Sequence, residues 1–149
     1  VRRIVDAAGG AGIPDGRYHL LVVRGAAHRE RLVAVMHRAQ GAAAGDAVSR
    51  AVAALESAPL VLAVLDRGED AALEGRLGAA VQSLRIAAHA LGYGTAWLAG
   101  ALCRDDDVAI ALEVAAPWRL VALLPLGVAA EAVVPADRLN EAENYTIVS

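Results

Sequence analysis

The feature that most constrains this 149-residue chain is a helical segment, residues 76–91, that is apolar on almost every side. Its main apolar stripe advances by four and three residues alternately: Leu77, Val81, Leu84, Ala88 and Leu91. Further alanines and one isoleucine make its other faces apolar as well. A helix of this kind is covered on more than one side. We therefore expect it to pack both in its own subunit and against another, with His89 in the core or in the interface.

The composition agrees with an oligomer. Apolar residues make up 57% of the chain, and the mean hydropathy of +0.44 is high for a soluble monomer. The longest apolar run, Leu120 to Ala130, is shorter than the ~20 residues that cross a bilayer, and it contains Pro125 and Gly127. An extensive subunit interface therefore explains the hydrophobicity better than a membrane span.

Charge and residue usage exclude several classes of function. The net charge of −3 argues against nucleic acid as a partner. All 14 basic residues are arginine, so no lysine Schiff base or P-loop lysine is available. The single Cys103 rules out an internal disulfide, and the four histidines lack metal-ligand spacing, so no metal site is expected. No signal peptide is visible, which favours a cytoplasmic location.

Periodicity predicts helices and strands interspersed along one domain, residues 1–149. Strands are expected at 17–25, 58–66, 95–100 and 118–127, and helices at 1–8, 26–40, 46–55, 76–91 and 104–114. The apolar run at 58–66 suits a strand covered on both faces, and Gly92 suits a left-handed helix end. Helical spacing begins at Val1 without a cap, so we expect the native N-terminal segment to be missing.

Small residues near position 100 form the most informative candidate site. The "GGAG" at 9–12 follows a helix rather than a strand, so it does not match a dinucleotide fingerprint. The acids at 105–107 are explained by a helix N-terminus. Gly92 and Gly94 fit a helix stop and a turn, but Ala99 and Gly100 extend the pattern as bare backbone, which a flat ligand needs. No side-chain acid–base pair or nucleophile emerges, so a bound cofactor would carry any chemistry.

The segment "AAVQSLRIAAHALGYGTAWLAG" resembles the signature helix and strand of the nitroreductase family of flavin-dependent oxidoreductases. The order of "ESAPLVLAVLD", "ALEVAAPWRLVALLPLG" and "PADRLNEAENY" is similar too. Among subgroups, the chain is most similar to the C-terminal reductase domain of deazaflavin-cofactor glutamyl ligases. The resemblance implies an α+β three-layer sandwich with a mainly antiparallel sheet flanked by helices. It also implies a homodimer with FMN at the subunit interface.

The resemblance also implies which residues bind the cofactor. Backbone at Leu98, Ala99 and Gly100 would lie beside the flavin ring. Arg138 in "ADRLNE" would hold the FMN phosphate, and Arg17 and Tyr18 would contact the pyrimidine edge.

The expected function is therefore an FMN-dependent oxidoreductase that passes hydride from NAD(P)H, through the flavin, to a small nitro, quinone or enone acceptor. The chain departs from the family pattern at the phosphate clamp. The family's N-terminal arginine pair lies before its first helix, whereas this sequence begins inside that helix, "IPDGRYH" has lost an Asn and a Gln, and Ala136 replaces a basic residue. Each lost hydrogen bond between a charged side chain and the phosphate weakens the free energy of FMN binding by ~1.5–3 kcal/mol. A non-catalytic or flavin-sequestering dimeric scaffold of the same fold is the alternative.

Overall fold

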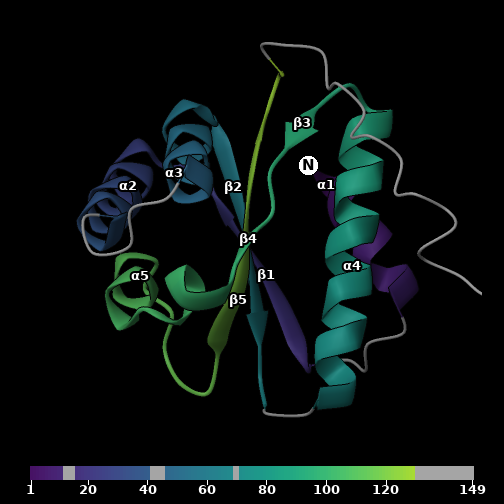
Figure 1. Cartoon of the computed structure of the whole chain (residues 1–149). Coiled ribbons are helices and arrows are strands. Elements are labelled where there is room, and N and C mark those ends of the chain that lie inside the picture. The colour runs from purple at the N-terminus through teal and green to yellow at the C-terminus, as the bar shows by residue number, and fades with distance from the viewer. Residues whose placement is uncertain (12–15, 41–45, 69–70, 130–149) are drawn as a thin grey trace, which may run out of the picture.

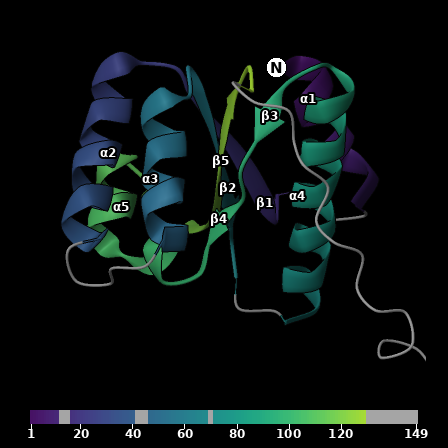
Figure 2. The same ribbon diagram turned by 45° about the horizontal axis from the view of Figure 1, so that its top comes forward.

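The computed structural model describes residues 1–11, 16–40, 46–68 and 71–129. They form three layers, with one sheet between two groups of helices (Figure 1). Helices α1 (Arg2–Asp6) and α4 (Ala71–Ala90) cover one face of the sheet. Helices α2 (Ala26–Gln40), α3 (Asp46–Ser57) and α5 (Asp106–Ala111) cover the other, as the turned view in Figure 2 also shows. The expected α+β sandwich is confirmed.

The sheet has five strands, all paired antiparallel. Its order is β1 (Tyr18–Val23), β2 (Leu60–Asp66) and β5 (Arg119–Gly127). The short strands β3 (Gly94–Thr95) and β4 (Leu98–Ala99) follow one after the other along the outer edge of β5. Every residue of β2 is buried, which confirms the expectation of a strand covered on both faces.

The outer edge of β5 is paired only in part. The expected single strand at 95–100 is two short strands, because the ladder breaks at Ala96 and Trp97. The break lies opposite Leu124 and Pro125, which have no partner in β3 or β4. Proline has no N–H to donate to a neighbour on this edge, although Pro125 still pairs with Val61 on the β2 side. Pairing resumes with Leu98 and stops again after Ala99, opposite Ala122.

Helix α4 begins at Ala71, five residues before the predicted start, and ends where expected. Gly92 has φ +81°, its N–H donates to the His89 carbonyl at 2.9 Å, and the Tyr93 N–H donates to the Ala88 carbonyl at 2.9 Å. These two bonds form a Schellman motif, which a glycine permits without steric cost.

In the described ranges of a single chain, only one side of α4 is covered. Leu77, Val81, Leu84 and Ala88 are buried against the sheet. On the other side, Ile86 is 60% exposed, and His89 is exposed as well. The expectation that His89 is a core residue is therefore wrong, because that side of the helix faces away from the sheet. Its alternative place in a subunit interface stays a prediction.

A short 3-10 helix, Ala7–Ala11, follows α1, and a second one, Gly100–Arg104, follows β4 and leads into α5. The Asp105 side chain accepts a hydrogen bond from the Asp107 N–H at 2.9 Å, which caps α5. The acids at 105–107 thus begin a helix, as predicted. No helix in the described ranges is long and apolar enough to span a bilayer.

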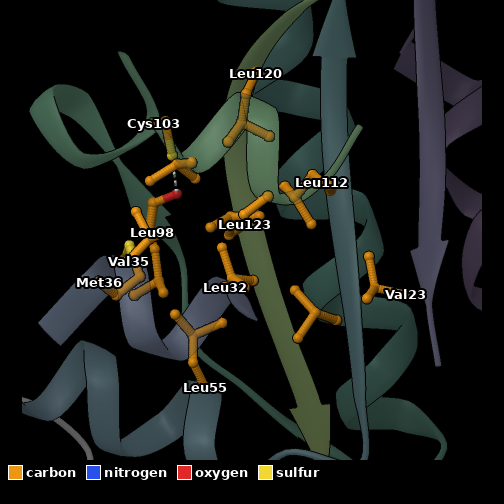
Figure 3. Packing of buried hydrophobic residues seen from close by; sticks show 14 of the residues in the cluster. Val23, Leu32, Val35, Met36, Leu55, Leu98, Cys103, Leu112, Leu120 and Leu123 are labelled. Atoms are coloured by element: carbon orange, nitrogen blue, oxygen red, sulfur yellow. Dashed lines mark hydrogen bonds between the residues drawn. The ribbon is translucent and has the colours of Figure 1, made fainter. Parts of the chain in front are cut away.

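Two hydrophobic clusters fix the helices to the sheet. The cluster between the sheet and α2, α3 and α5 includes Leu32, Leu55 and Leu123 (Figure 3). The cluster between the sheet and α4 includes Leu62, Leu84 and Leu124. Leu123 and Leu124 therefore point to opposite faces of β5, as alternation along a strand requires.

Replacing Leu123, which is fully buried, with alanine should lower the free energy of unfolding by ~2–5 kcal/mol, because it removes buried methyl groups and leaves a cavity. Urea denaturation measures the change. Ile110→Ala, on a side chain that is 69% exposed, is the control and should change stability by less than ~0.5 kcal/mol. Equal losses in the two variants would contradict the place of Leu123 in the core.

Cys103 belongs to the hydrophobic cluster between the sheet and α2, α3 and α5. Its Sγ donates a weak hydrogen bond to the Leu98 carbonyl at 3.4 Å (Figure 3). Burial raises the pKa of this thiol from 9.0 to about 11. At pH 8 the native thiolate fraction should then be about a hundredfold below that of an ordinary cysteine.

We expect a thiol reagent such as DTNB to label Cys103 far more slowly in the native protein at pH 8 than in guanidinium chloride. The unfolded thiol also loses its proton first, so the free energy of unfolding should fall as the pH rises from 9.0 to about 11. Cys103→Ala should lose this part of the pH dependence. Fast native labelling at pH 8 would contradict the burial.

Candidate functional site

The backbone at Ala99 and Gly100 is open to solvent in a single chain. Both residues are exposed, and Gly100 has φ +81°, a backbone conformation that residues other than glycine rarely adopt. A Cβ placed on Gly100 would have no atom within 4 Å. The predicted stretch of bare backbone therefore exists, and the described part of the chain does not cover it.

This backbone borders a cavity of about 460 Å³. The end of β2, the first residues of β5, the 3-10 helix after β4 and the start of α5 line it, together with Leu77 from α4. Arg119, Leu120 and Val121 line it consecutively, next to the register shift in the pairing of β2 with β5. Bulges of this kind often occur beside functional sites because they redirect side chains. The volume lies within the range of small-molecule sites.

An ion pair stands at the sheet side of the cavity. Arg119 Nη2 donates to Asp66 Oδ2 at 2.7 Å and also to the Gly68 carbonyl. Asp66 and Arg119 are direct partners in the β2–β5 ladder, so the sheet fixes their spacing. The Asp66 side chain is 2% exposed, whereas that of Arg119 is 47% exposed. The second oxygen, Asp66 Oδ1, is buried without a hydrogen-bond partner among the residues that the structure describes.

The opposite side of the cavity comes from the 3-10 helix and α5. Cys103 is buried there, whereas Arg104 and Asp106 are exposed. Trp118 supplies an aromatic surface, and the guanidinium carbon of Arg67 lies 5.7 Å from the centroid of its ring. With Asp105, the lining carries three carboxylates and two guanidinium groups.

The other predicted site residues lie outside this lining. Tyr18 pairs with Asp66 across the β1–β2 ladder, and the Arg17 carbonyl accepts from the Arg67 N–H at 3.1 Å. Leu98 is buried in the core, so only its backbone remains for a ligand. Arg138 lies outside the described residues. The structure thus brings Ala99 and Gly100 to the cavity and places Tyr18 beside Asp66, while the cofactor-binding role of all six residues stays a prediction.

Asp66 and Arg119 are the polar residues that sequence reasoning missed. Each stands at the end of an apolar run, Asp66 after "APLVLAVL" and Arg119 before "LVALLPLG". Opposite charges at the facing ends of two buried antiparallel strands were a usable signal, because such strands place their ends together.

A second cavity, of about 630 Å³, lies along β1, between α2 and the segment after α5. Glu113 Oε1 lies 3.1 Å from Arg31 Nη2 and 3.3 Å from His28 Nε2, and the hydrogen bond from Arg31 lowers the pKa of Glu113. These groups are largely exposed, and such pairs contribute little to stability. None of the predicted site residues lines this cavity, so its larger volume does not make it the better candidate. In the described ranges, no group of histidine, cysteine and acidic side chains could hold a metal.

Comparison with solved structures identifies the fold. An FMN-dependent nitroreductase from Clostridium difficile R20291 matches with a TM-score of 0.75 and 17% identity, covering 97% of this chain and 84% of that one. A nitroreductase with bound FMN from Bacteroides fragilis NCTC 9343 matches with a TM-score of 0.74 and 20% identity, covering 99% and 86%. An iodotyrosine deiodinase bound to FMN and 3-iodo-L-tyrosine matches with a TM-score of 0.74 and 18% identity, covering 99% and 86%.

At these identities the likeness shows the fold alone. No curated protein matches the sequence. The model of the nitroreductase family, however, matches residues 16–128, which include the whole sheet and the backbone at Gly100. The chain therefore belongs to the nitroreductase family, whose members are generally oxidoreductases.

Proposed function

We propose that this protein is an FMN-dependent oxidoreductase that uses NAD(P)H to reduce a small organic acceptor of the nitro, quinone or enone type. The open backbone at Ala99 and Gly100, beside a cavity of about 460 Å³, is the observation that carries the proposal. FMN in two of the similar structures supports the choice of cofactor.

The residues present fit a flat ring. Gly100 adds no side chain, and Ala99 adds only a methyl group, so a planar molecule could approach the main chain closely. Backbone of Leu98, Ala99 and Gly100 would lie along the ring, Arg17 and Tyr18 would contact its polar edge, and Arg138 would bind the phosphate. When bound, FMN would supply the hydride-transfer chemistry, so the site would not need a side-chain acid–base pair.

We propose a homodimer as the active form. Four large apolar side chains on α4 and in the segment after it are 41–60% exposed: Ile86, Leu91, Tyr93 and Trp97. Exposed apolar side chains of this size are commonly covered by a partner. A second copy of the chain would cover the side of α4 that faces away from the sheet.

Titration of the purified protein with FMN, followed by NAD(P)H oxidation with a panel of nitroaromatic, quinone and enone acceptors, tests the proposal. We expect FMN uptake, acceptor-dependent turnover and a dimer by light scattering. A protein that takes up no FMN would refute the proposal. Uptake of FMN without turnover of any acceptor would instead favour a flavin-sequestering scaffold.

Arg138→Ala tests the phosphate contact. Loss of one charged hydrogen-bonding group costs ~1.5–3 kcal/mol, so FMN affinity should fall roughly 10- to 100-fold. Riboflavin lacks the phosphate, and its affinity should not change. Arg2→Ala, on helix α1, is the control and should leave FMN affinity as in the wild type. Equal losses for FMN and riboflavin would show that Arg138 does not act on the phosphate.

A further inference from the structure

Asp66 Oδ1 is an unused acceptor at a ligand-sized cavity. The side chain is 2% exposed, and no described residue donates a hydrogen bond to its Oδ1 atom. Burial of a polar atom without a partner costs free energy, so such atoms are almost always satisfied in native proteins. Because Asp66 lines the same cavity as Gly100, a molecule bound there could supply the missing donor.

The ion pair leaves this acceptor in a fixed position. Arg119 Nη2 occupies Oδ2 at 2.7 Å, and it also binds the Gly68 carbonyl. Asp66 is held by its ladder pairs with Tyr18 on β1 and Arg119 on β5. A carboxylate held in this way can discriminate between molecules by the hydrogen bond that it accepts, since a ligand without a donor would leave Oδ1 unpaired.

The charges around the cavity indicate what kind of donor fits. Its lining contains the carboxylates Asp66, Asp105 and Asp106 and the guanidinium groups Arg104 and Arg119. The excess of one carboxylate disfavours an anionic group beside Asp66, and a cationic group is not needed there because Arg119 already balances the charge of Asp66. An uncharged O–H or N–H group can therefore complete the site without bringing another charge.

We propose that Asp66 is a specificity-determining residue, whose Oδ1 accepts a hydrogen bond from an uncharged O–H or N–H group of the molecule bound beside Gly100. The inference deepens the proposed function and rests on it for the reaction, but not for the hydrogen bond itself. Two groups could donate this hydrogen bond: an O–H or N–H group on the organic acceptor, and the ring N3–H of the flavin.

Binding of matched ligands tests the proposal without any turnover. 4-Nitrobenzyl alcohol and its methyl ether both carry an oxygen, but only the alcohol carries a donor. FMN and its N3-methyl derivative differ in the same way at the ring nitrogen. Dissociation constants are measured by calorimetry or ligand-observed NMR, with the nitrobenzyl pair added to protein with and without FMN.

The wild type should prefer the donor-bearing member of at least one pair by about tenfold, the value of one hydrogen bond to a charged group. Asp66→Asn keeps an oxygen for Arg119 and turns an NH₂ group toward the cavity, so this preference should vanish or reverse. The pair that responds identifies the source of the donor. Asp106→Asn, at an exposed carboxylate of the same cavity, is the control and should keep the wild-type preference.

Two results would overturn the proposal. The first is a wild type that prefers neither donor-bearing ligand, including one that binds neither pair, which would mean that water alone satisfies Oδ1. The second is a preference that Asp66→Asn leaves unchanged. A protein without NAD(P)H turnover that still shows the Asp66-dependent preference would refute the proposed function and leave this inference standing.

Discussion

The pairing of β2 with β5 is the interaction on which the rest of the structure depends. Both strands are apolar over nearly their whole length, so both faces of the sheet must be covered. One face takes α1 and α4, and the other takes α2, α3 and α5. The same pairing brings the charged ends of the two strands together and thereby forms the Asp66–Arg119 pair.

The irregular edge of β5 then provides the site. Because β4 pairs only with Leu123 and Ala122, the edge from Arg119 to Val121 has no strand beside it among the described residues. The chain turns away at Gly100 instead, and its 3-10 helix stands across from this edge. A cavity lined by backbone on one side and by an ion pair on the other follows from where the ladder stops.

Sequence patterns predicted those parts of the fold that periodicity determines. The buried strand ending at Asp66, the left-handed Gly92 and the acidic start of the helix after residue 104 were all expected, because each depends on local residue types. The start of α4 at Ala71 was missed, since the expected helix began only at residue 76, after an acidic, glycine-containing stretch. The core position expected as one alternative for His89 was wrong, because periodicity does not reveal which side of a mostly apolar helix meets the sheet.

Only the part of the candidate site that depends on local residue types was predictable. Small residues marked the open backbone at Ala99 and Gly100. The ion pair joins residues 53 positions apart, and its place beside Gly100 depends on strand register, which no local pattern encodes.

The cavity combines two kinds of surface. Strand residues, Asp66 and Arg119, lie in a ladder whose register cannot slip by one residue without turning apolar side chains to the wrong face. The facing turn, Gly100 to Asp106, carries exposed positions such as Ala101 and Arg104 that the core does not constrain. Descendants of this chain could therefore acquire new ligand preferences by substitutions in the turn alone, while the strands preserve both the scaffold and its buried carboxylate.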